Sequence, residues 1–376
     1  MRIEDFDAIR PLEPQELPAA YDRLEQDAQF RVVVNYLYPQ VPFEAIMQNM
    51  RKCHTCFEFQ KMFCYPFLKQ LMAKASTGLD LDASAIDVSS RYTFVSNHRD
   101  IVLDSALLDV LLIDAGAGTT CEIAIGDNLL AAPWIKDIVR INKSFIVERS
   151  LGIREMLAAS KRLSEYMHYV IGVKHDNVWI AQREGRAKDS DDRTQSSILK
   201  MMAMGGEGTV IDRLKALHIV PLSISYEYDP CDFLKAREFQ LKRDVPGWKK
   251  TKQDDVESMR TGIMGYKGHV HYHSAPCIDD WLDTLPQDMP KGELFDTIAA
   301  HIDKEIHRHY RLYATNRVAA GAESTDEEKA KFAHFIDNQI AKIQQLEQPD
   351  IPFLRERITT MYANPWHNHA KALNQE

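Results

Sequence analysis

The chain has 376 residues, long enough for one large α/β domain with additions or for two domains. Its 55 acidic side chains outnumber its 46 Lys and Arg residues, and the net charge of −9 argues against a dedicated nucleic-acid-binding protein. Six Cys residues are too few for a disulfide framework, and the acidic first residues do not resemble a secretory signal, so a cytoplasmic protein is expected.

Residues 1–84 are predicted to form a helical N-terminal segment. Apolar side chains recur there at three- to four-residue spacing, with few turn-forming residues. The stretch from Phe57 to Lys74 is rich in aromatic residues and Met, has basic flanks, and contains Pro66, which is expected to kink or end a helix. Two interpretations of this stretch stay open: a pair of core helices, or an amphipathic surface that rests on a membrane.

Residues 85–290 are predicted to form an α/β domain. Short strands are expected at 92–97, 119–126, 144–148, 178–184, 218–227 and 269–278, and helices alternate with most of them, the first from Arg99. This alternation predicts a largely parallel sheet covered by helices on both faces. The most apolar run, from Ile101, is interrupted by Asp104, Asp109 and Asp114, so no membrane-spanning helix is expected. Residues 291–376 are predicted to be a charged, helical C-terminal region.

The segment from Phe94 to Asp109 carries the clearest chemical signal. An apolar strand is expected to end at Asn97, and His98 follows it directly. A His at the carboxyl end of a strand, beside a helix N-terminus, lies where open α/β sheets place their sites. Both Asp100 and Asp104 are close enough in sequence to accept a hydrogen bond from the imidazole. Such a bond fixes the tautomer and leaves the other ring nitrogen free as a general base.

Three further patterns follow in order: INKSFIVERS, a strand that ends in Arg149; VWIAQREGRAKD, which runs into Glu184-Gly185-Arg186; and HIVPLSISYE, broken by Pro221. Together with the Asn-His pair and its Asp, this order resembles the four blocks of the glycerolipid acyltransferase superfamily, which includes the glycerol-3-phosphate and 1-acylglycerol-3-phosphate acyltransferases. The resemblance covers roughly residues 90–230. It implies an acyltransferase-like three-layer sandwich, with a mostly parallel mixed sheet and helical additions at both ends.

Two blocks depart from the pattern of this superfamily. Its first block has four residues between His and Asp, whereas here five residues separate His98 from Asp104. One added residue turns a helical side chain by about 100°, so Asp104 can pair with His98 only if the helix starts one residue later or its first turn is loosened. Asp104 is preferred over Asp100, because the Ser-Ala-Leu-Leu run aligns after it. The third block is one residue short, which leaves both Arg186 and Lys188 as candidates for a phosphate contact.

The resemblance implies an O-acyltransferase of phospholipid biosynthesis. The acyl group would pass from acyl-CoA or acyl carrier protein to the free hydroxyl of 1-acyl-sn-glycerol-3-phosphate, giving phosphatidic acid. His98 would be the general base and Asp104, or Asp100, its orienting carboxylate. Planar guanidinium groups suit a phosphate dianion, so Arg149 and Arg186 are the expected phosphate contacts, together with Glu184 and Gly185.

Neither a metal nor another cofactor is expected. An enzyme with lipid substrates is expected to attach peripherally to the inner face of the membrane. The alternatives are a glycerol-3-phosphate or other lysophospholipid acyltransferase, and a non-catalytic lipid-binding relative.

Other patterns compete with this interpretation. Cys53 and Cys56 form a C-x-x-C pair inside an expected helical run, and His269, His271 and His273 alternate along an expected strand, so a metal or thiol-redox protein is a third possibility. The stretch from Lys235 to Lys252 has a net charge of +5 and contains Trp248. It is either a solvated loop or a contact for anionic head groups or the phosphates of coenzyme A.

Overall fold

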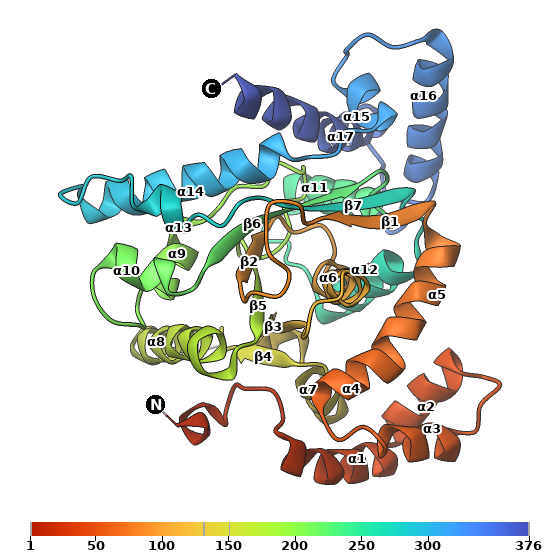
Figure 1. Cartoon of the computed structure of the whole chain (residues 1–376). Helices are drawn as coiled ribbons and strands as arrows, with labels where there is room; N and C mark the ends of the chain where they lie inside the picture. Colours follow the sequence, from red (N-terminus) through yellow and green to blue (C-terminus); the bar gives the residue numbers. More distant parts are fainter. Residues whose placement is uncertain (1, 131, 150, 375–376) are drawn as a thin grey trace.

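The computed structural model describes residues 2–130, 132–149 and 151–374, and within them seven strands form a single sheet (Figure 1). The strand order is β1-β7-β6-β2-β5-β3-β4. The five strands from β6 to β4 run parallel, whereas β1 and β7 run parallel to each other and antiparallel to β6. The strands are β1 (Gly78–Asp82), β2 (Thr93–Ser96), β3 (Cys121–Gly126), β4 (Ser144–Val147), β5 (Asn177–Ala181), β6 (Ile219–Tyr226) and β7 (His269–Ser274). The predicted α/β class, with a mostly parallel mixed sheet flanked by helices, is confirmed.

Strand β1 lies inside the N-terminal segment that was predicted to be helical, so that prediction is wrong at Gly78–Asp82. Leu79 and Leu81 alternate there with two Asp residues, which is the two-residue period of a strand. Five residues are too few for this period to stand out against the helical pattern before them. The strand pairs with β7 at the edge of the sheet.

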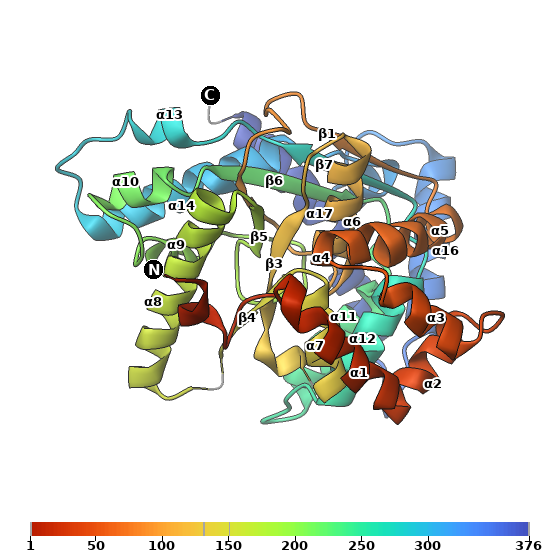
Figure 2. The same ribbon diagram turned by 60° about the horizontal axis from the view of Figure 1, so that its bottom comes forward.

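Helices cover both faces of the sheet (Figures 1 and 2). On one face, the core joins buried side chains of the sheet to α5 (Tyr65–Ala75) and α6 (Leu103–Asp114), with α12 (Lys252–Met264) beside them. On the other face, it joins the sheet to α8 (Ile153–Tyr169), α9 (Ser196–Met202), α10 (Val210–Lys215), α13 (Asp279–Leu282) and α14 (Lys291–Arg308). Strands β2 and β6 are buried along their whole length, as expected for central strands covered on both faces.

The most apolar run of the chain forms α6, which is buried on nearly all sides. Its Asp109 is buried too, and its carboxylate accepts hydrogen bonds from Gln60 Nε2 (3.0 Å) and from the Cys121 amide (2.8 Å). These bonds offset the cost of removing the carboxylate from water. Among the described residues, no helix is both long enough and apolar enough to cross a membrane.

The N-terminal helices form a core cluster of their own with α7 (Pro133–Ile141). They are α1 (Leu17–Gln26), α2 (Ala28–Leu37), α3 (Phe43–Met50) and α4 (Cys56–Phe59), and a π-helical turn at Gln60–Cys64 leads from α4 into α5. Pro66 stands in the first turn of α5, where its missing N–H costs little, so the expected irregularity lies just before it. Phe59, Leu68 and Leu71 are buried, which favours the core interpretation of the aromatic stretch.

The C-terminal region is helical, as predicted, but its first helix belongs to the central core. Ile298, Ile302 and Ile306 of α14 are buried in the core cluster that this helix shares with the sheet. The remaining helices, α15 (Ala314–Ala319), α16 (Asp326–Ala341) and α17 (Ile351–Leu373), pack together with α11 (Asp232–Asp244). A hydrogen bond of 2.8 Å from the Tyr362 hydroxyl to Asp232 joins α17 to α11.

Candidate active site

The chain leaves β2 in a fixed direction because the side chain of Asn97 pairs with the neighbouring strand. Its Nδ2 donates to the carbonyl of Ile224 (2.9 Å), and its Oδ1 accepts from the amide of the same residue (2.8 Å). The amide group thus continues the pairing between β2 and β6 by one step beyond the end of β2. Asn97 is fully buried, so its polar atoms need these partners. The next residue is His98.

The structure brings His98 and Asp104 together. His98 Nδ1 lies 2.8 Å from Asp104 Oδ2, and the His98 side chain is 13% exposed. The same carboxylate oxygen accepts from the amides of Arg99 (2.6 Å) and Asp100 (3.0 Å), which hold its orientation. Because a carboxylate only accepts hydrogen bonds, this contact places the imidazole hydrogen on Nδ1 and leaves Nε2 as a free acceptor.

Asp100, the other expected partner of His98, has a different role. Its Oδ1 accepts from the amides of Val102 (2.9 Å) and Leu103 (2.8 Å) and so holds the turn in front of α6. Helix α6 therefore begins at Leu103, and the expectation that it begins near Arg99 is wrong. Although five residues separate His98 from Asp104, the irregular turn before α6 still brings their side chains into contact. Burial raises the pKa of Asp100, and the neighbouring Asp104 carboxylate raises it further.

Two tyrosines that we did not select from the sequence also contact Asp104. The Tyr226 hydroxyl lies 3.5 Å from Asp104 Oδ1, and the Tyr272 hydroxyl donates to the Asp104 backbone carbonyl at 2.9 Å. Both side chains are buried, and they come from β6 and β7. Their sequence signal is weak, since aromatic residues in buried strands usually serve packing.

A close approach of α12 to the turn gives the first testable prediction. A Cβ atom at Gly262 would lie 1.9 Å from Asp100 Oδ2, and Asp100 is held in place by its two bonds to the turn. Gly262→Ala is therefore expected to displace the turn that carries His98. We expect it to lower the free energy of unfolding by about 1–3 kcal/mol, measured by denaturant unfolding. Gly172→Ala is the matched control, because no atom lies within 4 Å of a Cβ there. Equal behaviour of the two variants would contradict the prediction.

A cavity of about 690 Å³ lies along the carboxyl ends of β2, β3, β4 and β5. His98 lines it, together with Arg149, Glu184, Gly185 and Arg186, so the cavity brings together all of these predicted site residues. Much of the remaining wall is apolar, including Ile125, Leu129, Ile135, Val139, Leu163 and Met201. Its size and its mixture of apolar wall and few polar groups are typical of a small-molecule site.

The two predicted arginines differ in their surroundings. Arg149 follows β4, its side chain is 37% exposed, and its Nη1 lies 3.5 Å from Glu184 Oε1. Gly185 has a φ of +72° with open space where a Cβ would be, so the turn uses the freedom of glycine. This turn carries the chain back into the protein at Arg186, which is 7% exposed. One guanidinium nitrogen of Arg186, Nη1, is buried without a hydrogen-bond partner among the described residues.

The basic stretch from Lys235 to Lys252 is largely ion-paired. Five of its seven cations contact carboxylates: Lys235 with Asp229, Arg237 with Glu257, Lys242 with Glu238, Arg243 with Asp350, and Lys250 with Asp255. Several of these carboxylates lie outside the stretch, so its net charge in the sequence overstates its free charge in the fold. A broad contact of this stretch with anionic head groups is thus less favoured by the structure than by the sequence.

The competing thiol signal fits a structural role. Cys53 lies in the turn between α3 and α4, whereas Cys56 is the first residue of α4, and all six cysteines are free. Burial raises the pKa of both thiols, that of Cys56 to about 12, whereas a reactive thiol needs a lowered pKa.

The alternating His269, His271 and His273 contact the carboxylates of Asp80 and Asp82 on β1.

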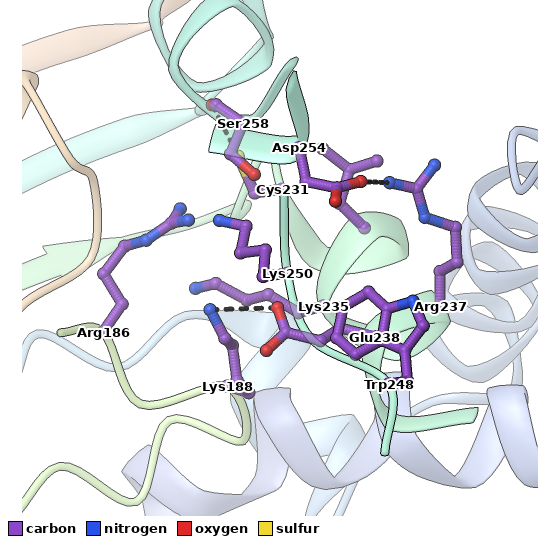
Figure 3. Close-up of a pocket in the computed structure, with 11 residues that line it drawn as sticks. Arg186, Lys188, Cys231, Lys235, Arg237, Glu238, Trp248, Lys250, Asp254 and Ser258 are labelled. Atoms are coloured by element: carbon purple, nitrogen blue, oxygen red, sulfur yellow. Dashed lines mark hydrogen bonds and ion pairs between the residues drawn. The ribbon is translucent and has the colours of Figure 1, made fainter. Parts of the chain in front are cut away.

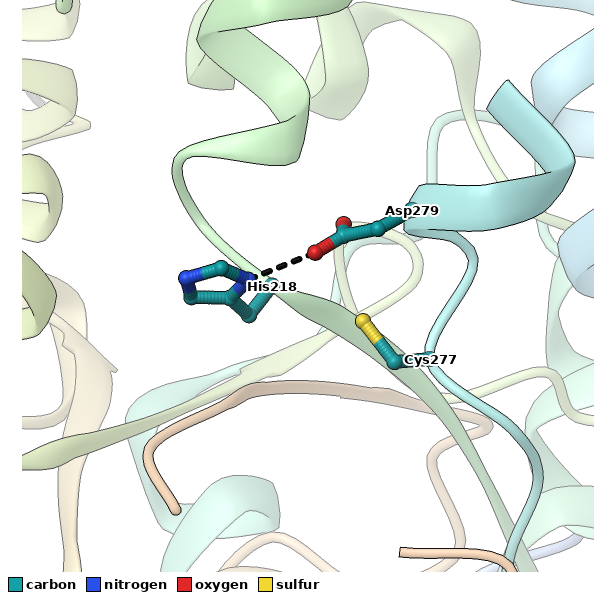
Figure 4. Close-up of side chains that lie close together, drawn as sticks. All are labelled: His218, Cys277 and Asp279. Carbon is teal, nitrogen blue, oxygen red and sulfur yellow. Dashed lines mark hydrogen bonds and ion pairs between the residues drawn. The ribbon is translucent and has the colours of Figure 1, made fainter. Parts of the chain in front are cut away.

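In the described part of the chain, one group brings three ligand-type atoms within 4.8 Å of one another: His218, Cys277 and Asp279 (Figure 4). His218 Nδ1 lies 2.6 Å from Asp279 Oδ2, so a hydrogen bond accounts for the approach of this pair. His218 immediately precedes β6, at the end of the parallel strands opposite to His98. The group therefore lies outside the candidate active site.

No protein-family model matches the sequence, and no curated protein sequence matches it. Among solved structures, the chain is similar to the crystal structure of the 1-acyl-sn-glycerophosphate (LPA) acyltransferase PlsC from Thermotoga maritima. The match has 12% sequence identity and a TM-score of 0.39, and it covers 77% of this chain and 92% of that chain.

Proposed function

We propose that the protein is a glycerolipid acyltransferase that moves a fatty acyl group from an acyl thioester to the free hydroxyl of 1-acyl-sn-glycerol-3-phosphate, giving phosphatidic acid. The observation that carries this proposal is the His98–Asp104 pair, 2.8 Å apart, at a cavity with an apolar wall and a buried arginine. The four sequence blocks described above support it.

In the proposed reaction, the acceptor hydroxyl oxygen attacks the carbonyl carbon of the thioester. Nε2 of His98 takes the hydroxyl proton as the C–O bond forms. The C–S bond then breaks, and the proton passes from His98 to the departing thiolate. Asp104 stabilises the imidazolium that forms between these steps, as the carboxylate of a Ser-His-Asp triad does. The apolar wall would take the acyl chain, and Arg186, with Arg149, would take the phosphate.

The direct test supplies purified protein with 1-acyl-sn-glycerol-3-phosphate and an acyl-CoA. We expect free thiol and phosphatidic acid to appear in equal amounts, measured with a thiol-reactive dye and by lipid chromatography. A matched reaction without acceptor separates transfer from thioester hydrolysis. Thiol release that does not depend on the acceptor, or no release at all with either acyl-CoA or acyl-acyl carrier protein, would contradict the proposal and favour a lipid-binding role.

We further propose that the protein attaches peripherally to the inner face of the membrane through the exposed side of α2 and the turn between α2 and α3. Four apolar side chains there are strongly exposed: Val32 (69%), Tyr36 (70%), Leu37 (42%) and Val41 (38%). Figure 2 shows this turn projecting from the body of the molecule. Clustered exposed apolar side chains are typical of surfaces that contact lipid or protein.

The membrane proposal predicts the behaviour of a double variant. Val32→Asp with Tyr36→Asp is expected to lower co-sedimentation with phosphatidylglycerol vesicles by at least about tenfold, because each side chain contributes apolar contact area. The control is Val173→Asp, which changes a well exposed Val (60%) outside this surface. Unchanged vesicle binding by the double variant would rule out this surface.

A further inference from the structure

A cluster of cations lies at one end of the substrate cavity, on segments that are far apart in the sequence. Arg186 and Lys188 follow β5, Lys235 and Arg237 lie on α11, and Lys250 precedes α12 (Figure 3). Two carboxylates, Glu238 and Asp254, line the same pocket, and three more contact its cations from outside the lining: Asp229, Glu257 and Asp255. An anion site in this cluster therefore depends on which cations lack a firmly held carboxylate partner.

Most of these cations already have a carboxylate partner. Lys235 contacts Asp229, Arg237 contacts Glu257 at 2.8 Å, and Lys188 contacts Glu238 at 3.2 Å. Arg186 differs from them, because it has no carboxylate in salt-bridge contact within the described residues, and its buried Nη1 has no hydrogen-bond partner there. A buried guanidinium N–H without a partner is costly and is satisfied when an acceptor binds.

Three of the cations line both this small pocket and the large cavity that contains His98: Arg186, Lys188 and Lys250. In Figure 3, the Arg186 guanidinium and the Lys250 ammonium point toward each other, and the Lys188 ammonium points into the same space from below. An anion between them would therefore lie in continuity with the cavity. The pocket behind them holds only about 10 Å³, the space of one water molecule, so nothing larger can extend beyond the anion.

Lys188 lies buried beside other cations. Burial, together with the neighbouring Arg186, Lys250 and Lys235, lowers its pKa to about 8, although Glu238 opposes this. A bound dianion would stabilise the Lys188 ammonium. The affinity for such an anion should fall as the pH rises above about 8.

Lys250 is the member of the cluster that is most able to change partners. It lies in the loop before α12, and its Nζ contacts Asp255 at 2.6 Å, where the Asp255 side chain is 31% exposed. A flexible ammonium can leave a partly exposed carboxylate for a doubly charged phosphate. Lys249, its neighbour, is exposed and lines neither the pocket nor the cavity.

We propose that Arg186, Lys188 and Lys250 form a phosphomonoester subsite, in which Lys250 exchanges Asp255 for the ligand's phosphate and the closed pocket excludes phosphodiesters. This inference rests on the proposed function for the identity of the ligand as the acceptor lipid. It assigns part of the phosphate recognition to a lysine outside all four sequence blocks.

The test compares Lys250→Gln with its matched control Lys249→Gln by calorimetric titration with glycerol 3-phosphate, and with coenzyme A against dephospho-coenzyme A. We expect Lys250→Gln to weaken glycerol 3-phosphate binding at least about tenfold, the effect of losing one charge-assisted hydrogen bond, and Lys249→Gln to have no effect. Asp255→Asn should tighten binding, because it removes the competing carboxylate. If Lys250→Gln instead abolishes only the preference for coenzyme A over dephospho-coenzyme A, the subsite is supported with the donor's phosphate as its ligand.

Equal binding of both ligands by the two lysine variants, both folded by circular dichroism, would overturn the subsite. That failure is distinct from failure of the proposed function. Glycerol 3-phosphate binding that depends on Lys250, without any thiol release, would support the subsite and contradict the proposed reaction. Equal acyl transfer by the two lysine variants, with 1-acylglycerol-3-phosphocholine accepted as well as the monoester, would support the proposed reaction and contradict the subsite.

Discussion

Replacing His98 with Gln is expected to lower acceptor-dependent thiol release by about 10²–10⁴-fold, the usual contribution of a general base. The amide of Gln has no nitrogen lone pair that can take a proton at neutral pH, so the acceptor hydroxyl would have to attack without proton removal. Because the imidazole lines the cavity and does not lie in a core cluster, we expect the variant to fold.

The measurement is the initial rate of thiol release at saturating acceptor, with unfolding curves for both proteins. His54→Gln is the matched control, because it changes an exposed imidazole with the same substitution. A His98 variant that retains the wild-type rate would refute the catalytic assignment. If the His98 variant lost both activity and stability, its binding of glycerol 3-phosphate would be measured, because a variant that is still folded should keep this binding.

Asp104→Asn is expected to lower the same rate on the order of 10³-fold, although the two side chains have nearly the same shape. The carboxylate accepts the Nδ1 hydrogen of His98, which keeps Nε2 free. In the Asn variant, the Arg99 and Asp100 amides still need an acceptor at the Oδ2 position, so the Asn oxygen stays there and the His98 tautomer is kept. The neutral side chain, however, no longer stabilises the imidazolium that forms during the reaction. The expected signature is a lower kcat with little change in the KM for the acceptor.

Asp100→Asn is the control for this variant. Asp100 is an equally buried carboxylate four residues earlier, and its Oδ1 accepts from the Val102 and Leu103 amides, a role that an Asn oxygen can keep. Its carboxylate has a raised pKa, so removing the charge is expected to be tolerated. If both variants lost activity equally, the geometry of the turn rather than the negative charge behind His98 would be the cause.

The sequence predicted the parts of the fold and site that depend on local pattern. The six strands expected between residues 85 and 290 are present because each combines apolar, β-branched residues with nearby turn residues. The approach of His98 to Asp104 was expected because the Ser-Ala-Leu-Leu run aligns after Asp104 in the family pattern, and Asp100 stayed open as the alternative partner. The length of the turn before α6 could not be predicted, because it depends on the hydrogen bonds that Asp100 accepts from the Val102 and Leu103 amides.

The remaining features depend on contacts between distant segments, which one sequence does not reveal. Lys250 approaches Arg186 only because α11 and α12 pack beside the turn after β5. The basic stretch around it loses most of its free charge to carboxylates elsewhere in the chain. The short strand β1 was not predicted from the sequence. The ion pairs that Asp80 and Asp82 on β1 form with the alternating histidines of β7 were therefore missed as well.

The pairing of Asn97 with Ile224 has a consequence for the order of folding. These two residues are 127 positions apart, yet their two hydrogen bonds set the direction in which the chain leaves β2 toward His98. Contacts of such long range form late, since a long loop must close before they are gained. During synthesis, the chain from β2 to β5 can therefore be complete while His98 has no fixed geometry. The turn becomes organised only when β6 has emerged from the ribosome and docked beside β2, so the candidate site cannot form before the chain has been made as far as Tyr226.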